Sequence, residues 1–336
     1  MSIISKNNWF VILCAMVFVP TSATAQINWQ ITHESTIDTA YYLISALSGN
    51  GKFFTASARK TYEIYGLTFI FLRSNDGGMT WTEQDPGLPY HVSAYHDYFN
   101  VLDQIDSLNV VSGSKYGLIL RTFDGGVTWE KQLAGDSLYP ITDINFSDPM
   151  NGILTKGGYV HQIWTTSDGG RNWLPAPTHA IANQCHSTGP GHYKVFEYGN
   201  GPLYKTDDNW VTVDTAYVSD SLNNPKKVLS LCDFGSGDLM FAYGSNWTSP
   251  GPRSLIARTS DDGKTWQDTT IGDFNYISSM SDPDRDTIVA GGFTINRILI
   301  STDRGLTWID DSSIIGDSSQ LDFPCGIFLT ADGHIV

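Results

Sequence analysis

Six aspartates recur in nearly the same surroundings, and a carboxylate can serve as a general acid, a general base or a metal ligand. They are Asp76, Asp124, Asp168, Asp208, Asp261 and Asp303. Five of them follow a Ser or Thr by two residues and precede a glycine and then a tryptophan, as in RTFDGGVTWEKQ at 121–132. Those tryptophans are Trp81, Trp129, Trp173, Trp266 and Trp308. A catalytic or metal site needs such a carboxylate at one place, so the repetition indicates a structural role.

The pattern has the chemistry of a hairpin turn. We expect the hydroxyl and the carboxylate to accept hydrogen bonds from backbone N–H groups that the turn leaves open. The glycine supplies a positive φ, and the tryptophan buries its ring between strands. The sixth copy, KTDDNWVTVDTA at 205–216, departs from this pattern, because Trp210 stands at the glycine position and Val213 at the tryptophan position.

The spacing of the copies identifies the elements that position them. The aspartates follow one another at intervals of 40 to 53 residues, which is the length of a four-stranded propeller blade. Between two copies, ITDINF (141–146), NGILTKGG (151–158) and VHQIWTT (160–166) read as three short strands separated by turn residues. A composition with 12% aromatic residues and 32 glycines agrees with many short strands and tight turns. The sequence predicts an all-β fold, a β-propeller.

The copies resemble Asp-box repeats, also called bacterial neuraminidase repeats. These occur in sialidases, sortilin-type receptors, some xyloglucan hydrolases and photosystem II assembly factors. The stretches LRTFDGGVTW and FSDPMNGILTKGG look most similar to the assembly-factor type. The resemblance covers residues 73 to 310 and implies propeller architecture with the boxes on the rim. It implies a binding propeller and no particular activity.

The number of blades depends on how the ring closes. Counting the strand after each copy, together with residues 27–35 around Trp29, predicts seven four-stranded antiparallel blades, with six as the alternative. We expect residues 26–336 to form a single domain whose last blade combines the strand at 27–35 with the C-terminal PCGIFLTADGHIV. That blade lacks a third strand before Val336, so either the blade is short or the chain is a truncated module of a larger surface protein.

A glycoside hydrolase is the alternative function. The sialidase resemblance would imply three arginines that hold a carboxylate, a Tyr and Glu pair as nucleophile, and an Asp as acid or base. Arg73, Arg121 and Arg258 each precede a box by one residue, so we interpret them as part of the blade pattern. The Arg-Ile-Pro element typical of sialidases does not occur. Xyloglucan hydrolases use two propellers, and this chain has the length of one. We expect no catalytic residue and no cofactor.

Other constellations carry weaker signals. The acidic turn DPDRD at 282–286 lacks the glycine and the terminal glutamate of a calcium loop. His179, Cys185, His186 and His192 match no zinc spacing, so we expect no metal. Cys185 and Cys232 fall on predicted inner strands of neighbouring blades, so a disulfide between them is conceivable, and Cys325 is the third cysteine of the predicted mature chain.

The loops between the second and third strands of each blade should lie opposite the boxes, on what we call the loop face. These loops combine basic and aromatic residues, which suits an acidic or carboxylate-bearing partner or stacked sugars. The candidate ligand-binding residues are Arg59, Lys60, Tyr62, Lys115, Tyr116, Lys156, Tyr159, Trp247, Arg253 and Arg297. The alternative is scattered solubilising charge, with tyrosines packing at strand ends.

Charge and the N-terminal segment set further limits. A net charge of −15 disfavours nucleic acid, because phosphate backbones require basic surface. Residues 1–25 have a lysine, a short apolar run and a final Ala-Thr-Ala, which predicts an export signal cleaved after Ala25. The apolar run is too short to span a bilayer comfortably. We therefore expect a secreted or periplasmic protein that binds a protein or a glycan.

Overall fold

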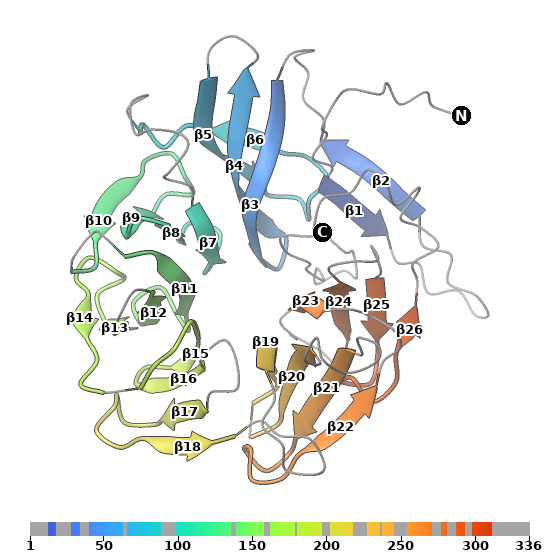
Figure 1. Ribbon diagram of the computed structural model, residues 1–336. Helices are drawn as coiled ribbons and strands as arrows, with labels where there is room; N and C mark the ends of the chain where they lie inside the picture. The colour runs from blue at the N-terminus through green and yellow to red at the C-terminus, as the bar shows by residue number, and fades with distance from the viewer. Residues whose placement is uncertain are drawn as a thin grey trace.

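The structure is a computed structural model that describes the chain in fifteen stretches. They are residues 13–17, 28–33, 40–62, 66–88, 99–135, 139–157, 162–178, 180–196, 202–217, 227–235, 237–244, 254–270, 277–280, 287–292 and 298–310. Every regular element among them is a β-strand. Six antiparallel four-stranded sheets follow one another around a ring, each formed by four consecutive strands (Figure 1). The fold is therefore an all-β propeller.

The first three blades span the N-terminal half. Blade 1 contains β3 (Ala40–Asn50), β4 (Phe53–Tyr62), β5 (Gly66–Ser74) and β6 (Thr82–Gln84). Blade 2 contains β7 (Phe99–Gln104), β8 (Val110–Ser114), β9 (Leu118–Thr122) and β10 (Glu130–Leu133). Blade 3 contains β11 (Ile141–Phe146), β12 (Gly152–Lys156), β13 (Gln162–Thr166) and β14 (Leu174–Pro175).

The other three blades continue the ring toward the C-terminus. Blade 4 contains β15 (Gln184–Gly189), β16 (His192–Phe196), β17 (Leu203–Thr206) and β18 (Asp214–Ala216). Blade 5 contains β19 (Lys227–Asp233), β20 (Leu239–Gly244), β21 (Ser254–Thr259) and β22 (Gln267–Thr270). Blade 6 contains β23 (Ile277–Met280), β24 (Ile288–Gly292), β25 (Ile298–Ser301) and β26 (Ile309–Asp310).

In blades 2 to 6 the first strand faces the centre of the ring and the fourth lies at the rim (Figure 1). Because neighbouring strands run in opposite directions, the turns after the first and third strands lie on one face of the ring. We call it the box face, since each Asp-box lies between a third and a fourth strand. The loop between the second and third strands opens onto the loop face.

Every inner strand contains an irregularity in its pairing with the second strand. In β3, β7, β11, β19 and β23 the register shifts near the beginning or middle of the strand, as between Ile141 and Asp143. In β15 the shift comes later, between Ser187 and Gly189. A bulge breaks the alternation of side chains between the two faces of a strand. It therefore decides which inner residues face a neighbouring blade.

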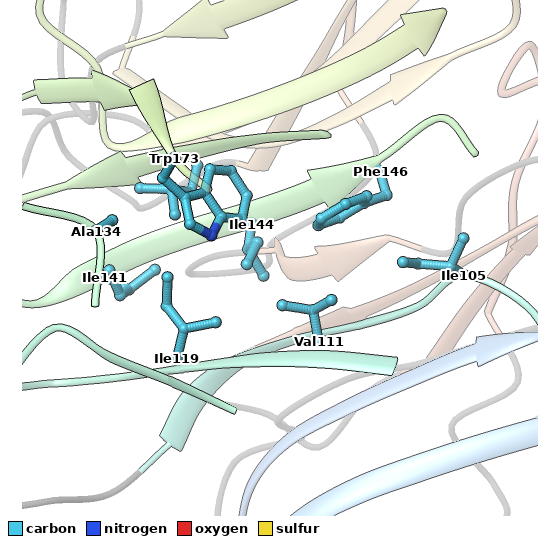
Figure 2. Close-up of a cluster of buried hydrophobic side chains, with 9 residues drawn as sticks. Ile105, Val111, Ile119, Ala134, Ile141, Ile144, Phe146 and Trp173 are labelled. Atoms are coloured by element: carbon cyan, nitrogen blue, oxygen red, sulfur yellow. The ribbon is translucent and has the colours of Figure 1, made fainter. Parts of the chain in front are cut away.

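Apolar side chains fill the space between neighbouring blades. Between blades 2 and 3, residues from both sheets point toward one another (Figure 2). The labelled members of this cluster are Ile105, Val111, Ile119, Ala134, Ile141, Ile144, Phe146 and Trp173. Similar clusters lie between blades 3 and 4, 4 and 5, and 5 and 6. Burial of these surfaces is the main force that holds separate sheets in one ring.

A seventh, smaller sheet lies between blades 1 and 6 in the ring (Figure 1). It pairs β1 (Leu13–Val17) with β2 (Asn28–His33). The strand expected at 27–35 is thus present, and its partner among the described residues is β1, within the predicted export signal. The expected C-terminal strand at 324–336 lies outside the described residues. Closure of a last blade by both chain ends therefore stays a prediction.

In the part of the chain that the structure describes, no helix has the length and apolar character needed to cross a membrane.

The structure also places two of the cysteines. Cys185 and Cys232 are both buried, and neither forms a disulfide. Cys185 packs between blades 3 and 4, whereas Cys232 packs between blades 5 and 6. The conceivable disulfide between them is absent, and Cys325 lies outside the described residues.

Candidate functional site

The six box aspartates hold the same hydrogen-bond cage in every blade. In blade 2, the Thr122 hydroxyl donates to Asp124 Oδ1 at 2.8 Å and accepts the Gly126 N–H at 2.7 Å. Asp124 Oδ1 also accepts the Thr128 N–H at 2.9 Å, and Oδ2 accepts the Thr128 hydroxyl at 2.6 Å. The equivalent hydrogen bonds in blades 1, 3, 4, 5 and 6 fall within 0.2 Å of these distances. Each carboxylate is thus occupied by the turn in which it lies.

The cage lowers the pKa values of these carboxyl groups. The hydrogen bonds from the Thr128 hydroxyl and amide lower the pKa of Asp124 to about 2. The hydrogen bonds from Thr212 likewise lower the pKa of Asp208. A carboxylate held in its charged form by donors is a poor proton donor near neutral pH. This chemistry matches the structural role that the repetition predicts.

Two consecutive residues after each box aspartate adopt positive φ. In blades 1 to 3 both are glycines, such as Gly125 and Gly126 at φ 77° and 87°. In blade 4 they are Asn209 and Trp210, at φ 57° and 71°. Asn adopts this left-handed backbone conformation readily, but for a residue as large as Trp it costs roughly 1–2 kcal/mol. The sequence pattern revealed the second of these positions and missed the first.

The box tryptophans of blades 2, 3, 5 and 6 anchor each of these blades to the preceding one. Trp129 stacks on Phe71 of blade 1 with ring centroids 4.1 Å apart, and Trp173 packs into the cluster between blades 2 and 3. In blade 4 the tryptophan that packs against the preceding blade is Trp210. It is 2% exposed and stacks on Tyr193 in the cluster between blades 3 and 4. Val213, at the usual tryptophan position, is 39% exposed. The divergent copy has moved its anchor by three residues.

The basic residues before the boxes reach forward to the next blade. Arg121 donates to the Pro149 carbonyl at 2.8 Å, and Arg258 donates to the Arg304 carbonyl at 3.0 Å. Arg73 donates to the Ser107 carbonyl, and Lys205 donates to the Asp262 carbonyl at 2.8 Å. Each cation therefore ties its blade to the following one on the box face. This placement agrees with the reading of the three arginines as blade pattern.

Arg121 is the most buried of these cations. It has no exposed surface, and its guanidinium lies 4.3 Å from the Phe123 ring and 4.9 Å from the Phe146 ring. Burial, followed by the nearby charge of Arg171, lowers the pKa of Arg121 to about 10. The side chain is enclosed by aromatic rings and by the glycines of the next box. Stacking between rings favours a planar guanidinium over an ammonium.

The predicted ligand residues of the loop face have different surroundings. Lys115 and Tyr116 are exposed in the β8–β9 loop, and Arg59 is half-buried in β4. Lys60 is buried, with Nζ 2.8 Å from both carboxylate oxygens of Glu83. Lys156 is fully buried and donates to the Ala134 carbonyl. The structure thus directs Lys60 and Lys156 into the blades, while a ligand role for the group stays a prediction.

The rest of that set is only partly described. Tyr62 is the last residue of β4, and its side chain is outside the described part. Four others lie outside the described residues altogether: Tyr159, Trp247, Arg253 and Arg297. The same holds for the DPDRD turn and for His179. Among the described residues, no three His, Cys, Asp or Glu side chains are grouped so that they could hold a metal ion.

Sequence reasoning missed an ionisable group on the inner strand of blade 3. Asp143 Oδ2 accepts the Cys185 N–H of blade 4 at 2.8 Å, and its Oδ1 accepts the Ile144 N–H at 2.9 Å. Burial raises the pKa of Asp143 to about 7, in opposition to the hydrogen bonds from these two amides. Two positions further along the inner strand, Asn145 accepts the Ser187 N–H of blade 4 at 2.8 Å, and its counterpart in blade 2, Asp103, accepts the Phe146 N–H of blade 3 at 2.6 Å. Polar acceptors on inner strands thus repeatedly contact an amide of the next blade, and this repetition is the signal that could have directed attention to Asp143.

Comparison with known proteins shows similarity in fold alone. No known protein family and no curated protein matches the sequence. The structure is similar to YCF48 bound to D1 peptide, with a TM-score of 0.60 and 15% identity over 88% of this chain and 93% of that one. It is similar to the GH74 xyloglucanase from Xanthomonas campestris, with a TM-score of 0.58 and 14% identity over 78% of this chain and 45% of the enzyme. For the WD40 propeller domain of Doa1, the TM-score is 0.56 and the identity 12%, over 90% of each chain.

Proposed function

We propose that the protein is a non-catalytic binding propeller whose loop face recognises a segment of a partner protein. The observation that supports a protein partner most directly is the YCF48 structure, which has a similar propeller and contains a bound D1 peptide. From this similarity we infer only the class of ligand, a segment of a protein. The similarity does not identify the partner of this chain, because the two sequences share 15% identity.

The chemistry of the box face supports a binding role over a reaction. The described carboxylates of the boxes are occupied by their own turns, and the arginines before them donate to backbone carbonyls. The functional surface of the proposal is therefore the opposite face, where Lys115 and Tyr116 are exposed. An acidic or carboxylate-bearing segment suits a lysine beside an aromatic ring.

A glycoside hydrolase is the second candidate, because propellers of GH74 enzymes share the fold. The chain spans about half the length of the matched xyloglucanase. Release of a fluorophore from aryl glycosides, or of oligosaccharides from xyloglucan, would establish this alternative if a variant of a loop-face Asp, Glu or Tyr abolished it. Binding of either substrate without turnover would support a glycan-binding propeller instead.

A peptide array followed by calorimetry of the best peptide tests the proposal. The double variant Lys115→Ala/Tyr116→Ala should weaken binding at least about tenfold, because a salt-bridging lysine and a stacking ring are lost together. Val127→Ala is the matched control, since Val127 is 81% exposed on the box face. Equal weakening by both variants, or by the control alone, would refute the assignment to the loop face.

Export belongs to the same proposal. Cleavage after Ala25 would remove β1 and leave β2 without the partner it has in the structure. The freed strand would then be available to pair with another strand, as the predicted closure of the last blade requires. N-terminal sequencing of protein recovered from the periplasm or the medium tests this step. A chain that still begins before Gln26 would contradict it.

A further inference from the structure

A polar groove lies between blades 4 and 5 on the box face. Its volume is about 420 Å³, within the range of small-ligand sites in proteins. Blade 4 contributes Lys194 from β16, Lys205 from β17 and Asp214 from β18, and blade 5 contributes Asp262 from its box. Asp207, which precedes the box aspartate of blade 4, completes the charged lining. The groove therefore belongs to the interface that the divergent box borders.

Both lysines of the groove are already paired with carboxylates. Lys194 Nζ donates to Asp233, whose side chain is 1% exposed behind the groove wall. Lys205 Nζ donates to the carboxylate and, at 2.8 Å, to the carbonyl of Asp262. Because these ammonium groups are satisfied, an incoming anion would have to displace an internal carboxylate. The groove is thus poorly suited to an anionic ligand.

The carboxylates at the rim are more accessible. Asp207 is 89% exposed at its side chain, and its Oδ1 lies 2.9 Å from Nδ1 of the exposed His192. Asp214 is exposed and lies directly opposite Lys205 in the pairing of β17 with β18. Three aspartates therefore share this groove with two lysines, one of which is neutralised by Asp233. The local field favours a cation, and a net charge of −15 attracts cations at longer range.

The geometry indicates an organic cation. No three acidic, His or Cys side chains of the described residues are close enough to hold a metal ion. The groove also has more volume than a bare ion requires. The Asp262 N–H donates to the Gly237 carbonyl at 2.9 Å, so the blade 5 wall is fixed by its own turn. A preformed polar site of this size suits an ammonium group on a flexible stem.

The divergence of the blade 4 box coincides with this site. Thr212 and Asp214 line the groove on either side of Val213, the position that holds a tryptophan in the other copies. Side chains alternate along the outer strand, so Thr212 and Asp214 face the groove, whereas position 213 faces the side on which other copies direct their tryptophan toward the preceding blade. The outer strand therefore presents small and charged side chains to the groove.

We propose that this groove binds the ammonium-bearing side chain of a lysine in a peptide. The inference rests on the proposed function only in that the ligand belongs to a protein segment. The groove lies on the opposite face from Lys115 and Tyr116. The two sites can therefore be tested separately.

Calorimetry of the whole chain with acetyl-Gly-Gly-Lys-Gly-Gly-amide at low ionic strength tests the inference. The same peptide with norleucine in place of lysine, and with N-acetyl-lysine, controls for the apolar stem and for size. We expect binding of the lysine peptide alone, weakened by added salt, since exposed charges are screened. Equal binding of the norleucine peptide, or no binding up to millimolar concentrations, would overturn the inference.

Variants locate the binding. Asp207→Asn/Asp214→Asn should weaken the lysine peptide about fivefold, the size expected from two exposed charge contacts. Asp85→Asn removes one exposed negative charge far from the groove and should leave the affinity unchanged. An unchanged affinity in the double variant, with its near-ultraviolet circular dichroism intact, would place the ligand elsewhere and refute the groove. If the double variant still bound the peptide selected from the array, the proposed function of the loop face would remain supported even though the groove was refuted.

Discussion

The boxes of blades 2 and 4 fulfil the same requirements with different residues. Both hold the cage, because Asp124 and Asp208 accept the amide and hydroxyl of the residue four positions later at 2.6 to 2.9 Å. They differ in the anchor, which is the regular Trp129 in blade 2 and the displaced Trp210 in blade 4. The cage and the anchor are therefore separable parts of the repeat.

The difference shows what each part is needed for. The cage satisfies backbone groups that a tight turn would leave open, so its side chains are fixed in place by local geometry. The anchor has only to bring one ring to the preceding blade, so its position along the chain can change. Blade 4 accepts a tryptophan at positive φ because the buried ring contributes more than the strained backbone costs.

Truncation of the anchors should have the largest effect. Trp210→Ala is expected to lower the free energy of unfolding by about 3–5 kcal/mol, because it empties a buried site between blades 3 and 4. Trp129→Ala should cost less, since that ring is only partly buried. Urea denaturation measures both, with Val213→Ala as a control expected to stay within about 0.5 kcal/mol. A costly Val213→Ala and a harmless Trp210→Ala would reverse the assignment of the anchor.

Restoration of the regular pattern sharpens the comparison. In Trp210→Gly/Val213→Trp, the glycine removes about 1–2 kcal/mol of backbone strain and the new tryptophan takes the usual anchor position. We expect the double variant to recover at least half of the stability lost in Trp210→Gly. A double-mutant cycle in urea provides the measurement. Strictly additive losses would show that blade 4 has no room for the regular anchor.

The sequence predicted more of the fold than of the candidate binding site. ITDINF coincides with β11, and the box spacing located the blades, because backbone chemistry at the turns is local. Lys60 and Lys156 were expected on the loop face but are buried. The direction of such side chains depends on how neighbouring blades pack. The alternation of side chains between the two faces of a strand does not reveal this packing. Asp143 was missed for a related reason, because a bulge beside it breaks that alternation.

The cages should respond to acid in the same way in both blades. The pKa values of Asp124 and Asp208 lie below the ordinary 3.8 in the folded protein. Their stabilisation is therefore complete above the unfolded pKa and is lost as the pH falls below about 4, in the case of Asp124 through its folded pKa of about 2. Asp124→Asn and Asp208→Asn should each flatten the pH dependence of the urea midpoint below about pH 4. A response in one variant alone would show that the cages are not equivalent.

The raised pKa of Asp143 acts in a different window. Its folded pKa of about 7 lies above the ordinary value of 3.8, so its charged form is disfavoured in the fold. Stability should therefore decline as the pH rises from about 4 to 7. Asp143→Asn should remove this decline, and thermal melting across that range measures it. The same decline in the variant would assign it to another group.

The smallest effect should come from the cation before the divergent box. Lys205 and Asp262 form a partly exposed ion pair, with side chains 13% and 43% exposed. Lys205→Met is expected to change the free energy of unfolding by about 0–1 kcal/mol. Lys264→Met, at an exposed position in the blade 5 box, is the matched control. A loss above about 2 kcal/mol would make this contact a main tie between blades 4 and 5.

The central claim is that the boxes build the ring while the loop face binds the partner. Calorimetric titration of the array-selected peptide into Asp124→Asn and into Lys115→Ala/Tyr116→Ala, below the melting temperature of each variant, tests it most directly. We predict that Asp124→Asn is less stable but binds with unchanged affinity, and that the loop variant is equally stable but binds at least about tenfold more weakly. Loss of affinity in folded Asp124→Asn, with full affinity in the loop variant, would contradict the account.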